Sequence, residues 1–109
     1  MKALFSALVQ ELRQDRRAVL CGILSSAGST PRRPGALMAV LSGGKRVGTI
    51  GGGALEERVW AEALLLLAGD ACRLRTFRLA DAGTPEHLNM ACGGEVTVSL
   101  QVLGPPALP

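Results

Sequence analysis

Apolar positions at helical spacing mark two stretches of the chain. Near the N-terminus they recur every three or four residues, which predicts a helix over residues 2–15. The residues of this set are Leu4, Phe5, Leu8, Val9 and Leu12. A second set predicts a helix over residues 54–68 that stops at Gly69, a residue type suited to a C-cap. Its apolar face consists of Leu55, Val59, Ala63 and Leu66.

Four shorter stretches have the pattern of strands. Residues 18–25 and 36–41 are apolar runs too brief for helices. Residues 46–50 return from the second run through a glycine-containing hairpin turn at 42–45. Residues 72–79 form a further extended stretch, so these segments account for most of a sheet.

A fifth predicted strand, residues 96–102, alternates strictly between apolar and polar side chains. Such alternation is typical of a sheet with one buried and one wet face. The pattern therefore predicts a single small α/β domain of the α+β type, with a mixed, largely antiparallel sheet of about five strands and two main helices. It has too few βα repeats for a doubly wound Rossmann unit. We expect the domain to span residues 1–103, followed by a Pro-rich tail at 104–109.

Composition narrows the class of protein. The chain has 109 residues, 48% of them apolar but only 3% aromatic, which indicates one globular domain with an aliphatic core. The net charge is +3, but basic residues are scattered and aromatic residues that stack on bases are scarce, which argues against nucleic-acid binding. No apolar run approaches the roughly 18 residues of a membrane span, and no signal sequence is seen. A cytoplasmic location is therefore expected.

The three cysteines form neither a C-x-x-C pair nor a disulfide framework. Cys21 and Cys72 lie in apolar stretches and are expected to be buried core thiols. Cys92 precedes Gly93 and Gly94, which places it in open backbone. An accessible thiolate there is a nucleophile or a soft-metal ligand, whereas the simpler interpretation is a small residue in a turn.

A glycine run, Gly51 to Gly53, separates a predicted strand from the second helix. The unpaired N–H groups of a helix N-terminus favour a phosphate or carboxylate, and glycine lets a ligand approach the backbone. The alternative is a tight turn that requires positive φ, and spacing alone leaves both interpretations open. Glu56 and Glu57 follow in the first helical turn, where acidic residues are ordinary partners of the helix dipole.

A polar, proline-stiffened segment at residues 25–35 offers hydroxyl and guanidinium groups. Ser29, Thr30 and Arg32 are its candidate ligand-binding residues, because arginine binds phosphate through paired hydrogen bonds. A solvent-exposed loop with incidental arginines is the alternative.

Three segments in this order resemble the XdhC/CoxI family, accessory proteins of xanthine dehydrogenase and related molybdenum hydroxylases. The resemblance extends over about residues 4–103. The matching residues are Gly28-Ser29-Thr30-Pro31-Arg32 with Pro34-Gly35-Ala36 and Met38, then Val47 through Glu56, then Met90-Ala91-Cys92-Gly93-Gly94 with Glu95-Val96.

The resemblance implies a protein that binds molybdenum cofactor (molybdopterin), protects it while it is sulfurated and delivers it to a xanthine dehydrogenase-like hydroxylase. It implies a carrier rather than an enzyme. The implied partners are the hydroxylase apoenzyme and a cysteine desulfurase or a separate Rossmann-domain chain, and an exposed strand would favour a homodimer. The candidate cofactor-binding residues are Cys92, Gly93, Gly94, Gly51, Gly52, Gly53, Glu56, Ser29, Thr30 and Arg32, with Cys92 also the candidate metal ligand.

Two features depart from the family. Many relatives have cysteine where this chain has Ala54, so sulfur chemistry would rest on Cys92. Full-length relatives continue into a Rossmann-like domain, whereas this chain ends at Pro109, which implies a short member or a half that works with a partner. Two other functions are compatible with the motifs: an adaptor that docks a hydroxylase without binding cofactor, and a small enzyme with Cys92 as nucleophile. Few acid–base partners accompany that nucleophile.

Overall fold

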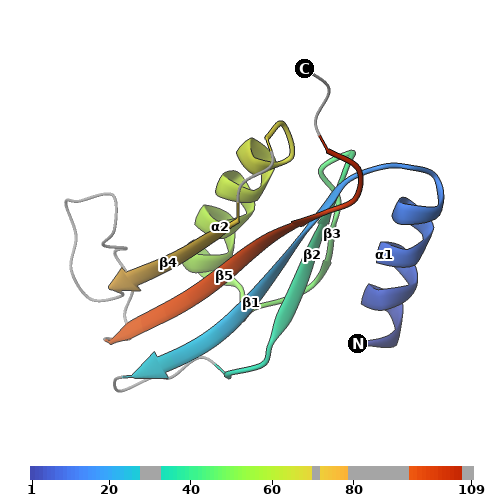
Figure 1. The fold of residues 1–109 in the computed structure, drawn as a ribbon. Coiled ribbons are helices and arrows are strands. Elements are labelled where there is room, and N and C mark those ends of the chain that lie inside the picture. The colour runs from blue at the N-terminus through green and yellow to red at the C-terminus, as the bar shows by residue number, and fades with distance from the viewer. Residues whose placement is uncertain (28–32, 70–71, 79–93, 107–109) are drawn as a thin grey trace.

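The strands form one antiparallel sheet in the order β3-β2-β1-β5-β4 (Figure 1). The structure is a computed structural model, and it describes residues 1–27, 33–69, 72–78 and 94–106. The strands are β1 (Ala18–Ala27), β2 (Leu37–Leu41), β3 (Arg46–Gly48), β4 (Arg73–Arg78) and β5 (Glu95–Leu103). The predicted α+β class is confirmed, and every neighbouring pair in the sheet is antiparallel.

Two helices lie on opposite faces of this sheet, α1 (Lys2–Arg13) and α2 (Gly53–Leu66). Both were predicted, and their ends agree with the prediction to within two residues. The predicted C-cap at Gly69 is wrong. Leu67 caps α2 with right-handed helical angles, φ −58° and ψ −25°, and the Gly69 N–H donates to the Leu66 carbonyl (3.0 Å) in a further tight turn. A helix can end in a tighter, 3₁₀-like turn without a residue in the left-handed conformation, as α2 does here.

The larger core lies between α2 and the sheet. The predicted apolar face of α2 is confirmed, because all four of its members are at most 3% exposed. They pack against inward-facing residues of the strands: Val19, Cys21, Ile23, Met38, Val40, Phe77, Val96, Val98 and Leu100. The period-2 alternation of each strand sends these side chains to one face.

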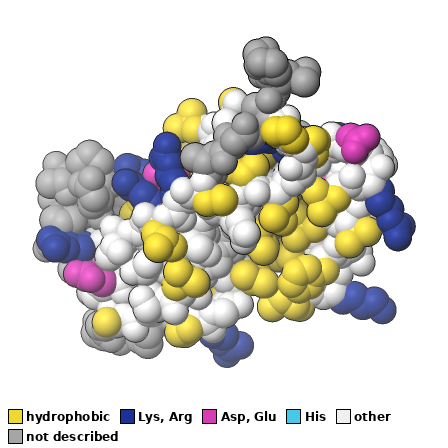
Figure 2. Space-filling model, in the orientation of Figure 1, with side chains coloured by type: hydrophobic (Ala, Val, Ile, Leu, Met, Phe, Trp, Pro, Cys, Tyr) yellow, Lys and Arg dark blue, Asp and Glu magenta, His cyan; other side chains and the backbone are white. Residues whose placement is uncertain are grey.

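A smaller core lies on the other face, where α1 packs against β2 and β3. It consists of Leu4, Leu8, Ala18 and Ala39. The buried side of α1 is narrower than its apolar pattern, because Phe5, Val9 and Leu12 remain 45%, 44% and 39% exposed. Figure 2 shows apolar side chains at the surface on the side of the molecule formed by α1. None of the helices that the structure describes is long and apolar enough to cross a membrane.

Candidate functional site

The sheet topology brings the described parts of the three sequence motifs to one end of the sheet. Antiparallel pairing of Met38 with Gly48 places residues 33–37, which lead into β2, beside residues 49–51, which follow β3. Pairing of Ala27 with Glu95 places the start of β5, just after Gly94, beside the end of β1. Described parts of all three motifs therefore share the end of the sheet where β1 terminates (Figure 1).

Five of the predicted site residues lie outside the described residues. They are Ser29, Thr30, Arg32, Cys92 and Gly93. Gly51, Gly52, Gly53, Glu56 and Gly94 are described. The structure therefore describes the glycine turn of the predicted site and parts of the other two motifs.

A cavity of about 650 Å³ opens where two motifs meet the N-terminal turn of α1. Its walls are mainly apolar, with one guanidinium and one hydroxyl side chain and several glycines. The lining residues are Met1, Ala3, Leu4, Arg33, Pro34, Gly35, Ala36, Leu37, Val47, Gly48, Thr49, Ile50 and Gly51. Because the cavity combines apolar walls with a single cationic side chain, it is suited to a largely apolar organic ligand that carries an anionic group.

The glycine run forms a tight turn between β3 and α2. Gly51, Gly52 and Gly53 have φ of 117°, 74° and 69°, values that residues with a Cβ rarely adopt. Three successive positive φ angles explain why three glycines stand here. The tight turn alone therefore explains the three glycines, and their presence is not by itself evidence of a ligand.

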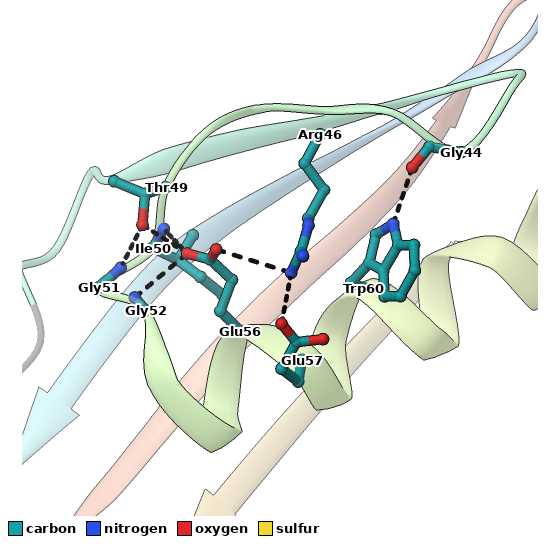
Figure 3. A network of polar contacts seen from close by, with 9 residues as sticks. All are labelled: Gly44, Arg46, Thr49, Ile50, Gly51, Gly52, Glu56, Glu57 and Trp60. Carbon is teal, nitrogen blue, oxygen red and sulfur yellow. Dashed lines mark hydrogen bonds and ion pairs between the residues drawn. The ribbon is translucent and has the colours of Figure 1, made fainter.

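Glu56 folds back onto this turn (Figure 3). Its Oε1 accepts hydrogen bonds from the Ile50 N–H (3.1 Å), the Gly52 N–H (3.1 Å) and the Thr49 hydroxyl. The Gly51 N–H donates to Thr49 Oγ1 (3.1 Å). The backbone donors of residues 50–52 are thus engaged by the protein itself, and the carboxylate of Glu56 occupies a position in which a bound anion would compete with it.

Several contacts act on the ionisation of Glu56. Partial burial of the carboxyl favours its neutral form, but hydrogen bonds from Thr49, Ile50 and Gly52, with the charge of Arg46, outweigh this effect. They hold the pKa of Glu56 below its ordinary value of 4.5. Glu56 is therefore a fixed negative charge at neutral pH, with hydrogen bonds directed into its own turn.

Arg46 links this turn to the rest of α2. Its guanidinium lies 3.0 Å from Glu57 and 3.8 Å from Glu56, and it stacks over the Trp60 ring at 4.6 Å. The Trp60 indole N–H donates to the Gly44 carbonyl (2.9 Å) in the β2–β3 turn (Figure 3). These contacts tie both ends of β3 to one helix, which holds the cavity wall formed by residues 47–51 in place.

The two described cysteines differ. Cys21 is buried as predicted, and burial raises the pKa of its thiol to about 12 from an ordinary value of 9.0. The prediction for Cys72 is wrong, because this residue is exposed. It precedes Arg73, the first residue of the edge strand β4, and so lies outside the packed part of the sheet.

We therefore expect iodoacetamide to alkylate Cys72 rapidly at pH 8 and to leave Cys21 unmodified in the folded protein. The thiolate is the reactive form, and Cys21 is both inaccessible and protonated. Peptide mass spectrometry before and after denaturation measures both sites. Modification of Cys21 at the same rate in the folded and denatured states would contradict the burial seen here.

Of the candidate site residues that the structure describes, Gly51 alone lies in the cavity wall, and three of the wall residues that sequence reasoning missed show why. Arg33 stood beside the chosen Arg32 in the same basic pair, so the pair itself was the available signal. Thr49 lies inside the second motif but was not selected. Leu4 reaches the cavity from α1, and only tertiary packing reveals that contact.

Comparisons with known proteins agree with the motifs. The sequence profile of the XdhC and CoxI family matches residues 11–78. The uncharacterized protein YqeB of Escherichia coli K12 is 36% identical over 101 residues, which are 93% of this chain and 18% of YqeB. A crystal structure of a xanthine dehydrogenase from Bacillus halodurans superposes with a TM-score of 0.66 at 25% identity, over 88% of this chain and 29% of that one. The chain thus spans less than a third of each of these relatives, and it belongs to the XdhC and CoxI family.

Proposed function

We propose that this domain binds molybdenum cofactor at the motif end of its sheet and helps deliver it to a xanthine dehydrogenase-like hydroxylase. Family membership and the similarity to a xanthine dehydrogenase support a role in the maturation of such an enzyme. The observation that carries the cofactor proposal is the cavity of about 650 Å³, since it is built from two of the three family motifs. The domain would act as a carrier and not as a catalyst.

The residues present fit this cofactor. A pterin is flat and requires apolar walls with a few polar contacts, and its phosphate requires a cation. The cavity supplies apolar walls and the Arg33 guanidinium, and the Thr49 hydroxyl oxygen keeps one lone pair beside its bonds to Glu56 and Gly51. The volume of the cavity lies within the roughly 300–1,000 Å³ of small-molecule sites. The cofactor supplies the redox chemistry of the hydroxylase, whereas this chain would hold it and shield it from water. In this proposal Cys92, with Gly93 and Gly94, would bind the molybdenum, and Ser29, Thr30 and Arg32 would supply further polar contacts to the cofactor.

Cofactor retention tests the proposal. Purified protein is mixed with molybdenum cofactor under anaerobic conditions, and the bound fraction is measured after gel filtration for the wild type, Cys92→Ser and Arg33→Gln. We expect tight binding by the wild type, and a loss of about tenfold for Arg33→Gln, equivalent to about 1.4 kcal/mol for one charged contact. Cys92→Ser should release cofactor faster if its thiolate contacts the metal.

Lys45→Gln is the matched control. It removes one exposed positive charge at the hairpin turn, at the opposite end of β2 from the cavity. Its affinity should equal that of the wild type. No retention by the wild-type protein at any concentration would overturn the carrier proposal and favour the adaptor.

A further inference from the structure

Beside its buried side, α1 carries an apolar stripe that no described element covers. Phe5 and Val9 are 45% and 44% exposed, and on the helix they flank the side formed by the buried Leu4 and Leu8. Leu12 and Met1, 39% and 70% exposed, extend the same stripe. Single exposed apolar side chains are ordinary, but a stripe at i, i+4 spacing along one helix indicates a contact surface.

A shallow groove of about 450 Å³ runs along α1, lined by side chains of this helix alone: Lys2, Phe5, Ser6, Val9, Gln10 and Arg13. Its middle consists of the apolar Phe5 and Val9 on one side and the polar Ser6 and Gln10 on the other, and Lys2 and Arg13 lie at its two ends. At about 1.5 Å of rise per residue, these two cations lie about 16 Å apart along the helix. The lining contains no carboxylate, and among the described residues neither cation is in an ion pair. The groove therefore has an apolar side formed by Phe5 and Val9 and a positive charge at both ends.

We propose that this face of α1 is the docking site for an amphipathic helix of a second protein, one that carries carboxylates about three turns apart. Apolar side chains of that helix would cover Phe5 and Val9, and its carboxylates would pair with Lys2 and Arg13. Recognition through an apolar helix face with charged flanks is a recurring mode of helix binding. The charges fix the orientation and register of the partner, and the apolar centre supplies most of the affinity.

The charges disfavour a second copy of this chain as the occupant. If two α1 helices packed antiparallel, Lys2 of each would lie beside Arg13 of the other. If they packed parallel, each cation would face its own equivalent. Both arrangements bring like charges together at both ends of the contact, which repels the helices.

The mixed lining of the groove disfavours a lipid surface. Phe5 and Val9 share the groove with the polar Ser6 and Gln10, so the apolar strip is narrow. An interfacial helix inserts its apolar face well into the acyl boundary of a membrane, whereas α1 uses Leu4 and Leu8 to hold the sheet. Figure 2 shows basic side chains beside apolar ones on this side of the molecule.

Two synthetic helical peptides test the proposal. One has leucines along a single face, with two glutamates 11 residues apart beside it, and the other has lysines in place of the glutamates. Fluorescence anisotropy of labelled peptide measures binding to the whole chain. We expect the acidic peptide to bind at least tenfold more tightly than the basic one, and its affinity to fall as salt is raised.

Three variants sharpen the test. Lys2→Glu with Arg13→Glu should reverse the preference between the peptides, and Phe5→Gln should weaken binding at least tenfold. Leu65→Gln, which removes a 72% exposed apolar side chain from α2, is the matched control and should bind like the wild type. Circular dichroism checks that each variant is folded. The charge-reversed variant changes only exposed side chains, so it carries the test even if Phe5→Gln does not fold.

The other occupants give different results. Equal binding of the two peptides, no binding of the acidic one, or an unchanged preference in the charge-reversed variant would overturn the proposal. Self-association in sedimentation that Phe5→Gln abolishes would identify a second copy as the occupant. Binding to phosphatidylserine vesicles in preference to the acidic peptide would identify a membrane.

Discussion

Replacement of Gly48 by alanine is expected to lower the free energy of unfolding by about 3 kcal/mol or more, from strain and collision together. Gly48 has φ of 83°, and a Cβ there would lie 2.6 Å from the Leu37 carbonyl oxygen and 2.8 Å from Leu4 Cδ1. The carbonyl belongs to the backbone of β2 and cannot turn aside. The alanine would therefore push β3 away from β2 or α1 away from both. Urea unfolding followed by circular dichroism measures the loss.

Gly35→Ala is the matched control. Gly35 has nearly the same φ, 89°, and also lines the cavity, but no described atom lies within 4 Å of the position its Cβ would take. The substitution therefore adds only backbone strain, about 1–2 kcal/mol. The difference in the free energy of unfolding between the two variants therefore measures the cost of the collision alone. Equal losses would show that the close approach of Leu37 and Leu4 does not contribute to the cost at Gly48.

Glu56→Ala should lower the free energy of unfolding by about 2–3 kcal/mol, because hydrogen bonds to a charged group are strong and their loss leaves buried donors unpaired. The Ile50 and Gly52 N–H groups would lose their acceptor, and Ile50 is only 1% exposed. Glu57→Ala is the matched control, since its side chain is 61% exposed and contacts the same Arg46. It should change stability by less than about 0.5 kcal/mol. A similar loss in both variants would mean that the charge near Arg46 matters and the turn does not.

The pH dependence of stability in the Glu56→Gln variant separates the effect of the negative charge from that of the side-chain shape. The pKa of Glu56 is lowered in the folded state, so its ionised form adds stability above the ordinary value of 4.5. This contribution is lost as the pH falls below that value through the folded-state pKa. The glutamine variant lacks this dependence, so its stability difference from the wild type should shrink between pH 7 and pH 3. A difference that stays constant over this range would contradict the assigned hydrogen bonds.

The fold was largely predictable because the elements have distinct periods. The strict alternation in β5 and the spacing of three to four residues in α2 indicate which side chains face the same core, and both faces were confirmed. The hydrophobic pattern gave wrong predictions of burial where a residue's burial depends on the neighbouring elements and not on its own segment. The apolar repeat of α1 does not reveal that only one seam of the helix meets the sheet, and the stretch around Cys72 does not reveal that β4 is an edge strand.

The site was predictable in its segments but less so in the roles of its residues. The motifs themselves marked residues 47–56 and 28–38, and the hairpin register explains why parts of both line one cavity. The direction of the Glu56 side chain could not be predicted from the sequence. A carboxylate in the first turn of a helix can face outward or fold back onto the preceding turn, and the sequence is the same in both cases. Leu4 lines the cavity because α1 packs beside it, and the motif residues carry no information on where α1 packs.

Trp60 gives the molecule an internal optical reporter. It is the single tryptophan of the chain, and it sits between the Gly44 carbonyl and the Arg46 guanidinium, so its emission originates from one contact between α2 and the β2–β3 hairpin. A change in its fluorescence therefore reports separation of the hairpin from the helix, without any label. Circular dichroism averages over all elements. Comparison of the two signals during titration with denaturant or cofactor shows whether the hairpin detaches before the sheet melts or together with it.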